Sequence, residues 1–369
     1  MKKLTALLLC LAILICMCSC KENKSKDNSL DNKQDDIISI NPTPPENTDP
    51  PVDPTPIPDP IVDPVTDPDP VTDPITDPEP AVDPEPVTPE ILGKSVTVSY
   101  PVEKANGGVT YTALPSLPEV EYTVPDAENT RALSTEKIDF AYGAAKDGEP
   151  HSITVNNQKI FDSYGTNALA WDNKTREKVL YLTFDCGYEY QNITPQMIDI
   201  LKEKNVPAAF FCTLDYIKDA PQAVKYMIEE GHIVGNHSVH HPSNSASLSR
   251  EKLASEFLGV HNYLRVNFGY SSQYFRFPTG AFSENALDLA ACIGYRSVFW
   301  SIAHADWDPE NQPGVDKSFK TVTSRLHPGA VILLHTTSPD NLAILGDFID
   351  YARNEGYTFK SLDDYAYWN

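Results

Sequence analysis

The chain has 369 residues, with 29 basic and 52 acidic side chains and 32 prolines. Prolines are concentrated in residues 41–90, which hold 18 of the 32 together with 13 acidic residues and no Lys or Arg. This window therefore carries −13 of the formal net charge of −23, and the rest of the chain is only mildly acidic. The lack of a basic patch argues against nucleic acid as a partner. The low glycine count of 17 excludes collagen.

The first 20 residues have the layout of an export signal. Lys2 and Lys3 precede an apolar run, 4–17, that has about the length of a signal-peptide core and is short for a bilayer span. Just after this run, Ser19-Cys20 resembles the processing site of a bacterial lipoprotein. We expect an exported protein that is anchored to the outer face of the cytoplasmic membrane by a lipid on Cys20. Ordinary signal cleavage and an uncleaved anchor are the alternatives.

Residues 21–90 predict a disordered linker rich in Pro, Asp and Thr. Short units such as Val-Asp-Pro and Thr-Asp-Pro recur in this range. Proline at this density removes backbone donors and fixes φ, so helices and sheets are excluded. An extended segment of this kind reaches roughly 100 Å or more. We interpret it as a stalk, and a disordered region without mechanical purpose is the alternative.

Residues 91–177 contain no recognisable motif. Strand-like alternation occurs at 95–100 and 109–112, and a further strand is predicted at 152–155. We expect a lead-in or a small accessory region.

From residue 178 the pattern changes to alternating strands and helices. Strands are predicted at 179–184, 208–212, 232–234, 274–277, 297–302, 330–334 and 357–360. Helices are predicted at 194–204, 221–231, 249–266, 283–293, 316–326 and 340–355. This alternation predicts a parallel α/β domain over 178–369. Functional sites in such domains lie at the carboxyl ends of the strands.

Reactive side chains follow the predicted strands in order: Asp185, His237 with His241, Arg276, Asp306 and His335. Their chemistry fits metal-assisted hydrolysis. His237 and His241 are four residues apart and would aim two imidazoles at one ion if the segment turns helically. Such an ion polarises a carbonyl and acidifies water. Asp185 is the candidate base and His335 the candidate acid, with Arg276 and Asp306 orienting them.

Five short motifs in this order resemble those of the polysaccharide deacetylase family, also called the NodB-homology domain or carbohydrate esterase family 4. They are Thr183-Phe184-Asp185-Cys186, His237-Ser238-Val239-His240-His241, Arg276-Phe277-Pro278-Thr279-Gly280, Asp306-Trp307 and Leu333-Leu334-His335. The resemblance covers about 178–366. It implies an irregular (β/α) barrel that hydrolyses the N-acetyl group of a glycan.

The resemblance also implies residue roles. Asp185 would be the base, His335 the acid, and His237 and His241 the ligands of a divalent metal, for which zinc is expected. Substrate contacts are expected at four positions, namely Trp307, Pro278, Gly280 and Leu333. His304 lies near the same rim and is a further candidate. Trp300 either stacks on a sugar or packs in the core.

One position departs from the family pattern. The second Asp of the first motif, a metal ligand in the family, is Cys186 here. A thiolate binds zinc and favours it over harder ions. The alternative is a small buried thiol that leaves the metal to the two histidines and water. Cys212 and Cys292 read as core residues, and these three cysteines do not form a disulfide framework, although one disulfide remains open.

The segments 183–189, 298–301 and 334–336, with Asn311-Gln312, resemble the muramic-acid deacetylase branch. This likeness implies an enzyme that acts on N-acetylmuramic acid of peptidoglycan. We expect a monomer. Peptidoglycan N-acetylglucosamine is the second candidate substrate, and chitin or xylan is the third. A surface lipoprotein that binds glycan without hydrolysis is the alternative of another class.

Overall fold

The structure is a computed structural model that describes residues 93–105 and 114–368. The predicted export signal (1–20), the predicted linker (21–90) and the predicted strand at 109–112 lie outside the described residues.

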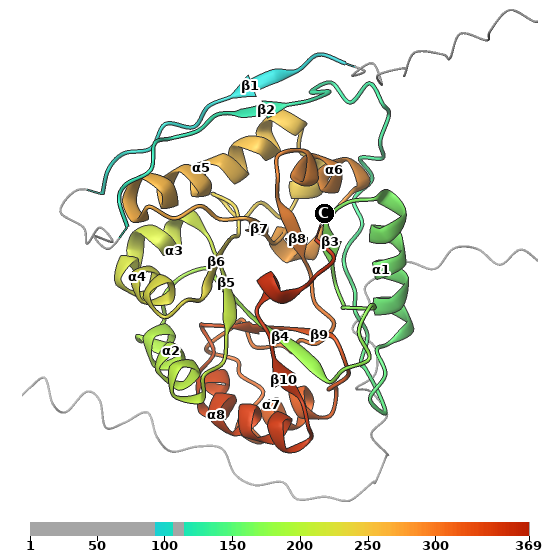
Figure 1. Cartoon of the computed structure of the whole chain (residues 1–369), viewed down its shortest axis with the longest axis vertical. Helices are drawn as coiled ribbons and strands as arrows, with labels where there is room; N and C mark the ends of the chain where they lie inside the picture. Colours follow the sequence, from blue (N-terminus) through green and yellow to red (C-terminus); the bar gives the residue numbers. More distant parts are fainter. Residues whose placement is uncertain (1–92, 106–113, 369) are drawn as a thin grey trace, which may run out of the picture. The chain divides into compact units, whose positions relative to one another are not determined.

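A curled parallel sheet forms the centre of the domain (Figure 1). Its strand order is β10-β4-β5-β6-β7-β8-β3. Strand β9 is not part of this path and also pairs with β4. A parallel bridge between Ile302, beyond β8, and Ile332 of β9 brings the two ends of the curl together. The predicted irregular (β/α) barrel is therefore confirmed. The strands are β3 (Ala168–Leu169), β4 (Val179–Cys186), β5 (Ala208–Cys212), β6 (Ile233–Asn236), β7 (Tyr274–Phe275), β8 (Arg296–Val298), β9 (Ala330–His335) and β10 (Thr358–Phe359).

Helices surround the strands (Figure 1). They are α1 (Ser152–Tyr164), α2 (Ile193–Lys204), α3 (Leu214–Asp219), α4 (Pro221–Glu229), α5 (Arg250–Phe268), α6 (Glu284–Cys292), α7 (Val315–Thr323) and α8 (Pro339–Asn354). The strands and helices predicted beyond residue 178 are confirmed, with ends shifted by a few residues. The short helix α3, which Thr213 caps, was not predicted. In the described part of the chain, no helix has the length and hydropathy needed to cross a membrane.

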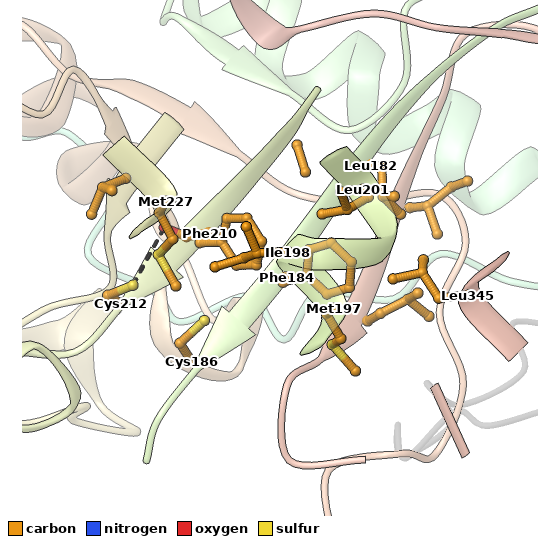
Figure 2. Close-up of a cluster of buried hydrophobic side chains, with 14 of the residues drawn as sticks. Leu182, Phe184, Cys186, Met197, Ile198, Leu201, Phe210, Cys212, Met227 and Leu345 are labelled. Carbon is orange, nitrogen blue, oxygen red and sulfur yellow. Dashed lines mark hydrogen bonds between the residues drawn. The ribbon is translucent and has the colours of Figure 1, made fainter. Parts of the chain in front are cut away.

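The central strand β4 is buried on both faces along its whole length. Leu182 and Phe184 point outward and pack against α2 and α8 side chains, including Met197, Ile198 and Leu345 (Figure 2). Val179 and Tyr181 point inward and pack with residues of the other strands, such as Phe211 and Val331. This period-two alternation places Asp185 on the inward face and Cys186 on the outward face.

A two-stranded antiparallel ribbon lies outside the parallel sheet. It joins β1 (Val96–Val98), within the strand predicted at 95–100, to β2 (Tyr122–Val124). Val98, Tyr122 and Val124 share a hydrophobic cluster with Phe257 of α5.

The strand predicted at 152–155 is wrong, because these residues begin helix α1. The β-branched side chains there favoured a strand. However, His151 accepts a hydrogen bond from the backbone nitrogen of Ile153 and caps the helix. The buried residues Thr154, Gln158 and Phe161 recur at helical spacing, which a four-residue window does not reveal.

The parallel sheet extends across the boundary predicted at residue 178. Strand β3 pairs with β8, and Gln158 of α1 fixes β3 by accepting from the nitrogen of Ala170 and donating to the carbonyl of Ala168. Part of the region predicted as a lead-in, 91–177, thus contributes to the sheet.

Candidate active site

The predicted reactive residues meet at the carboxyl ends of the strands, around a cavity of about 500 Å³. Asp185 and His335 lie on β4 and β9, while His237 follows β6 and Arg276 follows β7. The cavity is lined by Tyr142, Asp185, Gly187, Tyr188, His237, His241, Thr279, Trp300, Ala303, His304, Trp307, Leu333, His335 and Thr337.

Asp185 is held by a buried arginine. Its Oδ1 lies 2.8 Å from Nη1 of Arg276, whose Nη2 donates to Oγ1 of Thr183 at 2.8 Å. Burial alone would raise the pKa of Asp185, but the Arg276 guanidinium, helped by His237, lowers it below its usual value. Asp185 is therefore a carboxylate at neutral pH and is able to accept a proton.

A second acid–base pair joins Asp306 to His335. Oδ1 of Asp306 accepts from Nδ1 of His335 at 2.7 Å, and Oδ2 accepts from the His335 backbone nitrogen at 2.9 Å. Burial alone would lower the pKa of His335, but the Asp306 carboxylate raises it above its usual value. Burial alone would raise the pKa of Asp306, and His335 lowers it. The geometry leaves Nε2 of His335 free to serve as a proton donor.

The two predicted metal ligands, His237 and His241, lie together, with ring centroids 4.8 Å apart. Nδ1 of His237 donates to the carbonyl of Arg276 at 2.8 Å, so its Nε2 carries the lone pair. Burial lowers the pKa of His237 to about 4, which keeps this imidazole neutral. The two rings meet without the helical turn that we gave as a condition for this arrangement. A loop joins the two residues, with left-handed backbone at Ser238 (φ 72°) and His241 (φ 49°).

These histidines fit two positions of a metal site. Nε2 of His237 also lies 3.5 Å from Oδ2 of Asp185. Within residues 93–105 and 114–368, no three His, Cys, Asp or Glu side chains form a ready ligand group. Catalytic metal sites of this kind usually have three protein ligands, so the two imidazoles would supply part of a ligand set and leave the remaining positions to water and substrate.

Cys186 does not join the histidines. Its side chain is fully buried on the outward face of β4 and packs in the hydrophobic cluster with Phe184, Phe210 and Cys212 (Figure 2). It is absent from the cavity lining, and Cys186, Cys212 and Cys292 are free thiols. Cys212 is buried as predicted, whereas Cys292 is exposed at the end of α6, so the core position predicted for it is wrong. The prediction of Cys186 as a metal ligand is therefore replaced by the packed-thiol alternative.

The predicted substrate contacts divide into two groups. Trp307 and Leu333 line the cavity, and Trp307 is 59% exposed. Pro278 and Gly280 are buried behind the wall, and Thr279 between them faces the cavity instead. Gly280 has φ 74°, and a Cβ there would come within 2.8 Å of the Trp300 ring. Thr279 is thus the member of the Arg276–Gly280 motif that lines the cavity, and Pro278 and Gly280 support the wall from behind.

Some residues in or beside the cavity were not predicted. Tyr188 is 48% exposed and lines the cavity together with Trp307, so it offers a second aromatic surface. Asn341, at the start of α8, contacts Asp306 without lining the cavity. Tyr188 lies in the segment 183–189, which resembles the muramic-acid deacetylase branch, but no local pattern marks Asn341. His304 and Trp300, which were both candidates for contact with the sugar, line the cavity.

Comparisons with known proteins agree with this geometry. Residues 172–298 match the polysaccharide deacetylase family model. The peptidoglycan-N-acetylmuramic acid deacetylase PdaA of Bacillus subtilis is 37% identical over 239 residues, which cover 64% of this chain and 89% of PdaA.

Two solved structures extend the comparison. The structure of Bacillus subtilis PdaA, a family 4 carbohydrate esterase, has a TM-score of 0.59 at 38% identity and covers 63% of this chain and 97% of that one. A family 4 carbohydrate esterase from Bacillus anthracis has a TM-score of 0.52 at 36% identity, covering 64% of this chain and 100% of that one. The chain therefore belongs to the polysaccharide deacetylase family, carbohydrate esterase family 4.

Proposed function

We propose that the protein removes the N-acetyl group from N-acetylmuramic acid residues of peptidoglycan. One observation carries the chemistry: the Asp185–Arg276 and His335–Asp306 pairs open onto the same cavity as the two imidazoles of His237 and His241. Support for the sugar comes from the 37% identity to an N-acetylmuramic acid deacetylase.

The reaction is an amide hydrolysis with balanced proton transfers. A water oxygen bonds to the acetyl carbon while Asp185 takes the proton from that water. The carbon–nitrogen bond then breaks as Nε2 of His335 gives its proton to the leaving nitrogen. The products are acetate and a free sugar amine. Arg276 orients Asp185 and favours its ionised form, and Asp306 favours the protonated form of His335.

The family is generally metal-dependent, and we propose zinc for this chain. His237 and His241 would hold the ion, which would polarise the acetyl carbonyl and acidify a water. Zinc suits two neutral imidazoles, whereas magnesium and manganese prefer oxygen ligands. Cys186 takes no part in this proposal, because its thiol faces the opposite side of β4.

The cavity walls suit a sugar. Exposed Trp307 and Tyr188 offer aromatic faces, and Leu333 offers an apolar contact for the acetyl methyl group. A polar reaction centre between apolar walls is common in small-molecule sites.

We further propose that the protein is exported and lipid-anchored at Cys20, which places the domain next to the cell wall. The support is the sequence of residues 1–20 alone.

Mass spectrometry of peptidoglycan tests the function. Full-length protein in detergent, supplied with zinc, should release acetate from purified sacculi. Muropeptides from a glycan-cleaving digest should then be lighter by one acetyl group on muramic acid. Loss of acetyl from glucosamine instead would support the second substrate. Binding of sacculi without acetate release would support a glycan-binding lipoprotein.

A further inference from the structure

Asn341 forms hydrogen bonds with both members of the Asp306–His335 pair. It is fully buried in the first turn of α8, where its backbone nitrogen donates to the capping Ser338 hydroxyl at 3.0 Å. Its Nδ2 donates to Oδ2 of Asp306 at 2.5 Å and to the backbone carbonyl of His335 at 3.1 Å. One amide group thus contacts both members of the pair.

These two bonds determine which way the Asn341 amide faces. Both acceptors are oxygens, so the NH₂ group has to point toward Asp306 and His335. Oδ1 then faces His304, whose Nε2 lies 2.9 Å away. Because Oδ1 only accepts, Nε2 of His304 carries the proton.

His304 gains little from other hydrogen bonds. Its side chain is buried, and within the described residues its Nδ1 has no hydrogen-bond partner. An unpaired buried lone pair is less costly than an unpaired buried N–H, which again favours the proton on Nε2. Nε2 of His304 also lies 3.6 Å from Oδ2 of Asp306, which is beyond hydrogen-bond distance. The bond to Asn341 is therefore the hydrogen bond that orients this imidazole.

The position of Asp306 explains why such support matters. His335 belongs to β9, whereas Asp306 lies in the long connection between β8 and α7. Asp306 is fully buried, and its Oδ2 is held by Asn341 and by the His335 backbone nitrogen. With Oδ2 held, Oδ1 is directed at Nδ1 of His335.

We propose that Asn341 is a positioning residue that locks the rotamer of Asp306 against His335, and that His304 acts through Asn341 by holding its amide. This proposal rests on the function proposed above, in which His335 is the proton donor. A small displacement of a catalytic group lowers turnover strongly, because its alignment with the reacting bond is lost.

The matched control is Asn262, another fully buried asparagine, on α5. Its Nδ2 donates to the carbonyls of Tyr100 and Val120, and its Oδ1 accepts from the Val120 nitrogen. Asn262→Ala therefore removes an equivalent set of bonds away from the cavity. It should match Asn341→Ala in lost stability but not in lost turnover.

Full-length Asn341→Ala should lower kcat for acetate release by about 10–100-fold with little change in KM. His304→Leu should lower kcat in the same way, whereas His304→Gln should retain much of it, because the glutamine amide can replace Nε2 as a donor. The double variant Asn341→Ala with His304→Leu should be little worse than Asn341→Ala alone, since both act on one contact chain.

Nitrogen-15 NMR of the histidine rings gives a readout that does not need activity. The Nδ1 proton of His335 should be protected from exchange in wild type and in Asn262→Ala, and less protected in Asn341→Ala. Unchanged protection and kcat in Asn341→Ala would overturn the proposal while leaving the function intact. Full activity of His335→Ala would instead overturn the proton-donor role, and the NMR comparison would still decide whether Asn341 holds Asp306.

Discussion

Asp185 and His335 occupy paired register positions on the neighbouring parallel strands β4 and β9. Paired residues of parallel neighbours point to the same face, and neighbouring strands lie about 4.8 Å apart. The candidate base and the candidate acid therefore flank one small volume, which His237 and His241 share. Their separate partners, Arg276 and Asp306, shift the two pKa values in opposite directions, as paired acid and base roles require.

Removal of either group should abolish most turnover. Asp185→Asn keeps the shape of the side chain but loses the base, and His335→Ala loses the proton donor. Each variant should lose about 10²–10⁴-fold in kcat, measured as acetate release. Zinc affinity should stay near wild type in His335→Ala, which serves as the control for site integrity. Near-normal turnover in either variant would contradict the assigned role.

Asp306 should determine the alkaline limit of activity. The Asp306 carboxylate raises the pKa of His335, so the protonated acid persists to higher pH. Activity is lost as the pH rises through this pKa. Asp306→Asn removes the negative charge, so the alkaline limb of the pH–rate profile should move to lower pH. An unchanged alkaline limb would mean that another group titrates there.

Cys186 should contribute to stability and not to metal binding. Cys186→Ser places a hydroxyl in an apolar cluster, so the free energy of unfolding should fall by roughly 1–3 kcal/mol. Cys212→Ser is the matched control, because Cys212 pairs in register with Cys186 on β5 and shares the cluster. Zinc titrations of wild type and both variants should give equal affinities. A selective loss in Cys186→Ser would restore the ligand hypothesis.

Asp126 should stabilise the segment that follows β2. Its buried carboxylate accepts from the nitrogen and hydroxyl of Thr130 and from Nε of Arg131. Burial alone would raise its pKa, but these bonds lower the pKa well below the usual range. Asp126→Asn should lower the free energy of unfolding at pH 7 by about 1–3 kcal/mol, measured by urea unfolding.

The sign of the pH dependence follows from the lowered pKa of Asp126. The stabilisation is present above the unfolded carboxyl pKa of about 3.9 and is lost as the pH falls through the folded value. The difference between wild type and Asp126→Asn should therefore shrink below about pH 4. Asp139→Asn is the control, because its pair with Lys137 is exposed and should contribute little. A difference that does not depend on pH would contradict this account.

Cys20 should be the membrane anchor. Cys20→Ala should move the protein from the membrane fraction to the soluble fraction, with activity retained. Cys18→Ala is the matched control, because Cys18 lies upstream of the predicted processing site and should leave the protein with the membranes. Sedimentation followed by immunoblotting distinguishes them. If Cys20→Ala still sediments like wild type, the anchor is not a lipid on this residue.

Local sequence determined most of the domain beyond residue 178. The continuous apolar run of β4 predicted a strand buried on both faces, and the capped amphipathic segments predicted the surrounding helices. Side chains that follow parallel strands necessarily meet at one end of the sheet, so Asp185, His237, Arg276 and His335 could be assigned together. Their identities also carried the chemistry, because carboxylates and imidazoles exchange protons near neutral pH.

Tertiary structure decided the features that depend on contacts between distant segments. Helix α1 forms because Gln158 hydrogen-bonds at the end of β3 and Phe161 packs in the aromatic cluster. The β-branched residues at its start do not reveal these distant contacts. Cys186 faces the core because strand alternation, set by the pairing of β4, gives the inward face to Asp185. Asn341 meets Asp306 across 35 positions of sequence, since the packing of α8 and not a local pattern brings the two together.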